Sequence, residues 1–152
     1  MARIQLALNV SDLSGAIDFY SRLFKAEPVK VRPRYANFAI DEPPLKLVLI
    51  EGGGEPGSIN HLGVEVFSTE EVTEAAGYLA GVGMATVVEE QTTCCYAVQD
   101  KVWVDGPDGA KWEIYTVLAD ANDAHSPCGD GLCCTSVPVA ETVAASTASS
   151  CC

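Results

Sequence analysis

The chain of 152 residues is poor in basic side chains, with 9 lysines and arginines against 21 aspartates and glutamates and a net charge of −12. Because no basic patch is present to neutralise phosphates, we expect no binding to nucleic acid or to an anionic membrane. The sequence also lacks an apolar run long enough to span a bilayer, and its first residues lack the pattern of a secretory signal. These absences predict a cytoplasmic protein without a membrane anchor.

The seven cysteines do not follow the pattern of a secreted disulfide framework, which favours an even number at scattered spacings. Six of them form adjacent pairs, at residues 94–95, 133–134 and 151–152. Adjacent cysteines rarely bridge each other, because the ring that they would close is strained. The pattern therefore predicts reduced thiols in an intracellular protein.

The last part of the chain differs in composition from the rest. Residues 119–152 contain no aromatic residue, no lysine and no arginine, and are rich in alanine, serine, threonine and cysteine. Such a segment cannot bury enough apolar surface to offset the entropy lost on ordering. We expect one folded domain at residues 1–118, followed by a Cys-rich, disordered tail at 119–152.

Within the domain, the sequence repeats. Residues 4–10 and 60–66 both alternate in the manner of a strand, and each run precedes a capped, helix-like stretch. Three strand candidates follow each helix, at 27–32, 35–41 and 45–51 and again at 85–91, 95–104 and 110–117. The predicted fold is α+β, with two βαβββ modules (about 1–52 and 58–118) forming a curved mixed sheet around a central cleft.

Three polar residues are candidates for that cleft. Gln5 and His61 occupy equivalent positions in the first strands of the two halves, so the repeat aims both at the centre. Glu113 lies between bulky apolar residues of a strand expected to be buried, and a buried carboxylate needs a metal or another cation beside it. The alternative is purely structural: a core histidine, a surface amide and a salt-bridge partner.

Three features resemble the glyoxalase, bleomycin-resistance and extradiol-dioxygenase superfamily, which has the vicinal oxygen chelate fold. They are the paired modules, the strand Asn60-His61-Leu62-Gly63, and the 105–109 turn before Trp112-Glu113. The resemblance covers about residues 3–117. The resemblance implies metal ligands at Gln5, His61 and Glu113. It places Val48, which cannot bind a metal, at the fourth ligand position. Three protein ligands leave room for substrate and dioxygen together, as in facial-triad iron oxygenases. The usual ligand at the first position is histidine, where this chain has glutamine.

The vicinal pair Cys94-Cys95 lies between two predicted strands. In a loop both sulfurs can converge on one soft centre such as trivalent arsenic. The alternative is that one cysteine serves only as a small buried hydrophobe. Together with the fold, the Thr92-Thr93-Cys94-Cys95-Tyr96 segment resembles the non-haem iron C–As lyase family. That resemblance implies Fe(II)- and dioxygen-dependent cleavage of the C–As bond of trivalent methyl or aromatic organoarsenicals.

In this interpretation Gln5, His61 and Glu113 act through the metal, while Cys94 and Cys95 hold the arsenic. Tyr96 and Lys101 are the further substrate-binding candidates, with Lys101 expected to be an exposed, solvated residue; Tyr115 is a candidate wall residue, and Asn9 and Glu65 are candidate neighbours of the ligands. Three alternatives stay open: a glyoxalase-type isomerase, a thiol transferase, and a non-enzymatic protein that binds a drug or an arsenical. The sequence is compatible with a monomer or a homodimer.

Overall fold

Two copies of one strand-and-helix order follow each other in the computed structural model, which describes residues 2–94 and 96–121. The elements are β1 (Arg3–Val10), α1 (Leu13–Phe24), β2 (Lys30–Arg32), β3 (Tyr35–Ile40), β4 (Leu45–Glu51), β5 (Ile59–Glu65), α2 (Thr69–Gly81), β6 (Thr86–Cys94), β7 (Ala97–Asp105), a 3-10 turn η1 (Pro107–Gly109) and β8 (Lys111–Asp120). The predicted βαβββ repeat is confirmed. Residues 119 and 120 still belong to β8, and the predicted tail from residue 122 onward lies outside the described residues.

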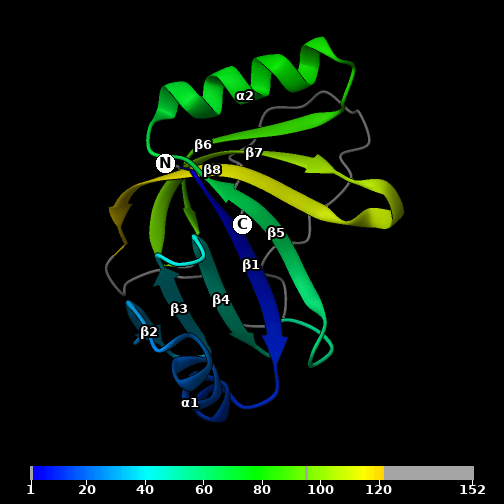
Figure 1. Ribbon diagram of the computed structural model, residues 1–152. Helices are drawn as coiled ribbons and strands as arrows, with labels where there is room; N and C mark the ends of the chain where they lie inside the picture. Colours follow the sequence, from blue (N-terminus) through cyan, green and yellow to red (C-terminus); the bar gives the residue numbers. More distant parts are fainter. Residues whose placement is uncertain (1, 95, 122–152) are drawn as a thin grey trace.

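All eight strands join one mixed sheet in the order β2-β3-β4-β1-β5-β8-β7-β6. The first strands of the two halves, β1 and β5, pair antiparallel at its centre, and each pairs in parallel with the last strand of its own half. Figure 1 shows β1 and β5 side by side in the middle of the curved sheet, with α1 and α2 at opposite ends. The repeat therefore brings two equivalent strands together where the halves meet.

Each helix covers one face of its own half, because apolar residues alternate along the strands beneath it. In the first half, Leu6, Leu8 and Val10 of β1 pack with α1 against a buried cluster of β3 and β4. In the second half, Val102 packs with α2 in the corresponding cluster. We call the opposite face of the sheet, turned away from both helices, the inner face.

The inner face buries polar side chains, which are usually exposed. Gln5, Ala7 and Asn9 of β1 alternate with the residues under α1, and each is at most 4% exposed. Polar side chains buried on this face need partners, because an unpaired buried polar group costs free energy.

Among the described residues, no helix is long and apolar enough to cross a bilayer.

Candidate metal centre

The strand register brings Gln5, His61 and Glu113 together on the inner face. Gly63 of β5 lies opposite Gln5 on one side and opposite Glu113 on the other. Gln5 Nε2 is 2.6 Å from Glu113 Oε1 and 3.0 Å from His61 Nε2, and His61 Nε2 is 3.3 Å from Glu113 Oε1. Each of the three is 4% exposed. We call them the triad; their role as metal ligands stays a prediction.

Donor spacing and chemistry suit a divalent metal ion. Two ligands at about 2.1 Å from an ion and at right angles to each other are about 3 Å apart, and His61 Nε2 and Glu113 Oε1 are 3.3 Å apart. Imidazole nitrogen, carboxylate oxygen and amide oxygen are donors that ferrous iron accepts. The described residues contain no cluster of three His, Cys, Asp or Glu, because glutamine takes the third place.

The Gln5 side-chain amide can adopt two orientations that differ by a half-turn. Its Nε2 donates to Glu113, while its Oε1 accepts a hydrogen bond from the Tyr115 hydroxyl. A hydroxyl both donates and accepts, so a half-turn of the amide keeps the Tyr115 contact and aims Oε1 at an ion. Tyr115 is thus a hydrogen-bonding partner of the triad as well as a buried residue.

At the fourth ligand position, the first half carries an apolar residue. Val48 faces Ala7 across the β1–β4 ladder just as Glu113 faces Gly63 across the β5–β8 ladder. It is 4% exposed and belongs to a buried cluster of five residues, Ala7, Tyr35, Val48, Ile50 and Tyr96. A glyoxalase-type site with four protein ligands is therefore not available within the described residues.

Gly63 leaves the space in which the triad meets. A Cβ added to Gly63 would lie 3.1 Å from Glu113 Cγ and 3.3 Å from Gln5 Cβ. We expect Gly63→Ala to lower the free energy of unfolding by about 1–3 kcal/mol, the usual cost of overpacking. Urea denaturation measures it. The control is Gly77→Ala in α2, where a new Cβ meets nothing within 4 Å and should be neutral or stabilising.

Lys101 is not the exposed residue that the sequence suggested, and that expectation was wrong. It is completely buried on the inner face, with Nζ 3.5 Å from Glu113 Oε2 and 5.3 Å from the centre of the Trp103 ring. The register explains this, because Lys101 lies opposite the buried Tyr115 of β8. Lys101 therefore contributes a positive charge beside the triad.

Glu113 is held in its ionised form by these neighbours. Burial by itself raises its pKa, but the Lys101 charge and the adjacent His61 and Gln5 side chains outweigh burial and lower the pKa to about 2. A carboxylate that stays ionised at neutral pH is the form that binds a metal ion. The site thus keeps an anionic ligand ready despite its burial.

Lys101→Met should leave a buried carboxylate without its cation. We expect the free energy of unfolding to fall by about 3–5 kcal/mol, the usual cost of breaking a buried ion pair. Chemical denaturation of the single variant, of Glu113→Gln and of the double variant measures the coupling. If the two losses simply add, Lys101 does not stabilise Glu113 and the pairing is contradicted.

Asn9 and Glu65 have different roles from each other. Glu65 binds Arg3 and Lys46, with Lys46 Nζ 2.8 Å from its Oε1, and these hydrogen bonds and charges outweigh burial and lower its pKa. Asn9 instead binds Asn60, whose Oδ1 lies 2.7 Å from His61 Nδ1. Asn9 is thus linked to the triad by hydrogen bonds through Asn60, a contributor that the sequence pattern did not single out.

The cysteine segment lies at the turn between β6 and β7. Cys94 ends β6, is 3% exposed and lies opposite Ala97, while Cys95 lies outside the described residues. Cys94 is disulfide-bonded in the structure, which differs from the reduced state expected for the chain. A thiol binds a soft ion only as the reduced thiolate, so reduction must precede any such binding.

Tyr96 extends this turn onto the inner face of the first half. Its hydroxyl donates to Pro33 O at 3.3 Å, its ring lies 5.7 Å from that of Tyr35, and its carbonyl accepts from Lys30 Nζ at 3.1 Å. Tyr96 also shares a buried cluster with Ala7, which lies opposite His61 in the β1–β5 ladder. Tyr96, which follows the cysteine pair, therefore shares a buried cluster with a residue of the strand that carries Gln5.

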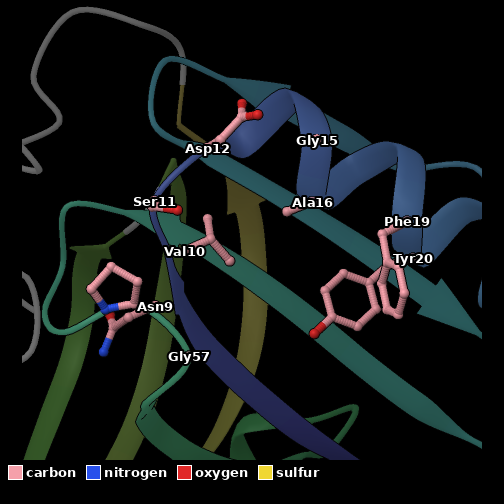
Figure 2. A pocket seen from close by; sticks show the side chains of 10 residues that line it. Asn9, Val10, Ser11, Asp12, Gly15, Ala16, Phe19, Tyr20 and Gly57 are labelled. Atoms are coloured by element: carbon pink, nitrogen blue, oxygen red, sulfur yellow. The ribbon is translucent and has the colours of Figure 1, made fainter.

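A separate pocket of about 360 Å³ lies where β1 enters α1. Figure 2 shows Asn9 and Gly57 at one end and the rings of Phe19 and Tyr20 at the other. None of the triad residues lines it. Its walls are largely apolar, and one of its lining residues, Asn9, is hydrogen-bonded to Asn60 beside His61.

Comparisons with known proteins agree with this architecture. The family described as "Glyoxalase/Bleomycin resistance protein/Dioxygenase superfamily" matches residues 3–114. An extradiol ring-cleaving dioxygenase from B. fuscum superposes with a TM-score of 0.58 at 20% identity, over 79% of this chain and 34% of that one. A Mn(II)-bound glyoxalase from Novosphingobium aromaticivorans gives 0.57 at 18% identity, over 84% of this chain and 44% of that one. These structures establish the likeness of fold.

Relatives found by sequence comparison share a much higher sequence identity with this chain. A "Trivalent organoarsenical cleaving enzyme" of Thermomonospora curvata is 59% identical over 136 residues, covering 89% of this chain and 89% of that protein. A "Cadmium-induced protein CadI" of Mycobacterium tuberculosis is 56% identical over 142 residues, covering 88% and 93%. A "Probable trivalent organoarsenical cleaving enzyme" of Bacillus subtilis is 35% identical over 139 residues, covering 91% and 94%.

Proposed function

Because this chain belongs to the Glyoxalase/Bleomycin resistance protein/Dioxygenase superfamily, we propose that it is an enzyme that cleaves the carbon–arsenic bond of trivalent organoarsenicals. The observation that carries the proposal is the meeting of Gln5, His61 and Glu113 on the inner face. Tyr96, next to the cysteine pair, shares a buried cluster with Ala7 of the same strand as Gln5. The 59% identity to a relative named as a trivalent organoarsenical cleaving enzyme supports the substrate class.

Cys94 and Cys95 bind the arsenic of the substrate. Trivalent arsenic is a soft centre, for which thiolates are preferred ligands. The two thiols displace two hydroxyl groups of the arsenical, so two S–As bonds form, two As–O bonds break and two water molecules leave. The organic group stays on arsenic, and the arsenic keeps its oxidation state. The dithiolate then holds the carbon–arsenic bond in a defined place, which removes much of the entropic barrier to its cleavage.

Gln5, His61 and Glu113 would hold ferrous iron through one amide oxygen, one imidazole nitrogen and one carboxylate oxygen. When bound, iron supplies the redox chemistry by which dioxygen, as the oxidant, converts the carbon–arsenic unit to arsenite and an oxygenated carbon fragment. The apolar Val48 limits the protein ligands to three, which leaves room for small molecules. Lys101 offsets the charge of Glu113, and Tyr115 fixes the amide of Gln5.

Tyr96 forms part of the wall beside the substrate. Its ring and backbone contacts tie the cysteine turn to the first half of the sheet. Lys101 lies on the same face of β7, two strand repeats from Ala97, where the turn ends. We expect Tyr96 to line the capture site beside Cys94, and Lys101, whose Nζ is 3.5 Å from Glu113 Oε2, to line the metal site.

The test is aerobic incubation of the reduced, iron-loaded protein with a trivalent organoarsenical, followed by separation and quantification of the arsenic species. We expect arsenite to be released, with dioxygen consumed in step. Parallel reactions without dioxygen and without iron should release none. Arsenite formed under anaerobic conditions would exclude the oxygenase mechanism, and complete recovery of the intact arsenical in all arms would exclude cleavage.

A second candidate is the binding of a soft metal or metalloid without turnover. The 56% identity to a relative named for its induction by cadmium favours it. A sequestering protein would bind the arsenical through its thiols and return it unchanged when a competing dithiol is added. The same arsenic analysis therefore separates the two candidates.

A further inference from the structure

A β-bulge beside the triad changes the direction of one side chain. Ala7 lies opposite His61 and Leu8 lies opposite Ile59, so Asn60 is an extra residue in β5. In an unbroken strand, neighbouring side chains point to opposite faces of the sheet. The bulge removes that alternation and lets two neighbours meet: Asn60 Oδ1 lies 2.7 Å from His61 Nδ1.

Asn60 is itself the middle of a hydrogen-bonded chain. Its Nδ2 donates to Asn9 Oδ1 at 2.9 Å, and Asn9 Nδ2 donates to Ser58 Oγ at 2.9 Å. The Ser58 hydroxyl donates in turn to the backbone carbonyl of Glu55 at 2.6 Å. We call these residues, together with His61, the amide chain.

The backbone carbonyl fixes the direction of the whole amide chain. A carbonyl oxygen only accepts, so the Ser58 hydroxyl must donate to it and its oxygen accepts from Asn9. The Asn9 oxygen then accepts from the Asn60 amide nitrogen, which leaves the Asn60 oxygen facing the imidazole. A second acceptor, Gly53 O, lies 3.4 Å from Asn60 Nδ2 and favours the same setting.

We propose that Asn60 is a positioning residue that keeps the proton of neutral His61 on Nδ1, and so directs the Nε2 lone pair at Gln5 and Glu113. Nδ1–H donates to Asn60, and Nε2 accepts from Gln5 Nε2 at 3.0 Å. A proton on Nε2, in the opposite tautomer or in imidazolium, would instead donate to Glu113 Oε1, which lies 3.3 Å away. The amide chain decides between the two tautomers, since it offers an acceptor at Nδ1.

Tight packing around Asn9 keeps the chain in place. Asn9 is 4% exposed, and a Cβ added to Gly53 would come within 2.8 Å of its Oδ1. A Cβ added to Gly54 would come within 2.7 Å of its Nδ2. The imidazole is also held by the Trp103 ring, whose centre is 5.6 Å away in an edge-on arrangement. Little room exists for Asn9 to turn its amide over.

The inference deepens the site on which the proposed function rests, but it concerns the metal-free protein and can be tested without turnover. The chain contains two histidines, so replacing His125 by glutamine leaves His61 as the single imidazole. Nitrogen-15 NMR of the reduced, metal-free, histidine-labelled variant, at a pH where the imidazole is neutral, reports which nitrogen carries the proton. We expect protonated Nδ1 and unprotonated Nε2. A proton mainly on Nε2 overturns the proposal.

Three variants then test whether Asn60 is responsible. Asn60→Leu removes the acceptor and should shift the proton toward Nε2 and weaken Fe(II) binding by about 10- to 100-fold, the usual effect of losing such a partner. Asn60→Asp keeps an acceptor oxygen and should restore the Nδ1 proton. Asn37→Leu is the matched control, because Asn37 is a buried amide of the other half that donates to the Tyr35 hydroxyl. It should change neither measurement.

If Asn60→Leu does not fold, Gly54→Ala gives the same information by displacing Asn9 without removing a donor or acceptor. It should increase the fraction of the Nε2–H tautomer. An unchanged tautomer in every folded variant overturns the proposal. Failure of organoarsenical cleavage with the expected NMR result would instead overturn only the proposed function, so the two failures are distinguishable.

Discussion

Replacing His61 by alanine should abolish Fe(II) binding and arsenite release while leaving the capture of a trivalent organoarsenical intact. The substitution removes one of three protein ligands, and a loss of more than about 100-fold in iron affinity is expected, because even partners of ligands are worth 10- to 100-fold. Tyr96, next to the cysteine pair, contacts Lys30, Pro33 and Tyr35, and these contacts do not involve His61. Capture should therefore survive.

Anaerobic titration with Fe(II) measures the first effect, and protein-bound arsenic after gel filtration measures the second. Glu113→Ala should behave in the same way, with an additional loss of stability because Lys101 is then left unpaired in the interior. The control is His125→Ala, which removes the other histidine of the chain. Arsenite release by His61→Ala at the rate of the unchanged protein would show that the triad does not hold the catalytic metal.

Cys94→Ser should have the opposite pattern, with organoarsenical capture and turnover lost and iron binding unchanged. A serine hydroxyl is similar in size to a thiol, but it is a hard donor that does not hold trivalent arsenic. Bound arsenic should fall from a stoichiometric amount to background. Cys95→Ser should give the same result, because one remaining sulfur cannot form a dithiolate.

Measurements on these variants require reduced protein, since Cys94 is disulfide-bonded in the structure. The matched control replaces both Cys133 and Cys134, a second adjacent pair, by serine. This control should keep full capture if the pair at 94–95 is the substrate site. Loss of iron in Cys94→Ser, or loss of capture in the control alone, would contradict a division of labour between thiols and triad.

The fold and the triad were within reach of the sequence because the chain is duplicated. Side chains alternate with a period of two along a strand, so equivalent positions in two equivalent strands face the same side. This placed Gln5 and His61 together without any knowledge of strand order. The family resemblance placed Val48 at the position equivalent to Glu113, and the β1–β4 and β5–β8 registers agree with that correspondence.

The features that escaped prediction depend on contacts between distant segments or on a break in the alternation. Asn60 is a neighbour of His61 in sequence, and a regular strand would turn it away; only the bulge brings it back. Lysine is usually a surface residue. The burial of Lys101 follows from its position opposite Tyr115 in the β7–β8 ladder and from the charge of Glu113. Tyr96 reaches Pro33, 63 residues earlier, which no local pattern encodes.

The proposed ligands come from the first strand of the domain and from its last, with Gln5 and Glu113 separated by 108 positions and joined through Gly63. During synthesis, the emerging polypeptide consequently has no complete chelating pocket until β8 has left the ribosome and docked. Iron uptake by the proposed site would then report finished folding, because contacts so remote in sequence form late and slowly. A nascent or truncated chain that stops before residue 111 should not bind the metal.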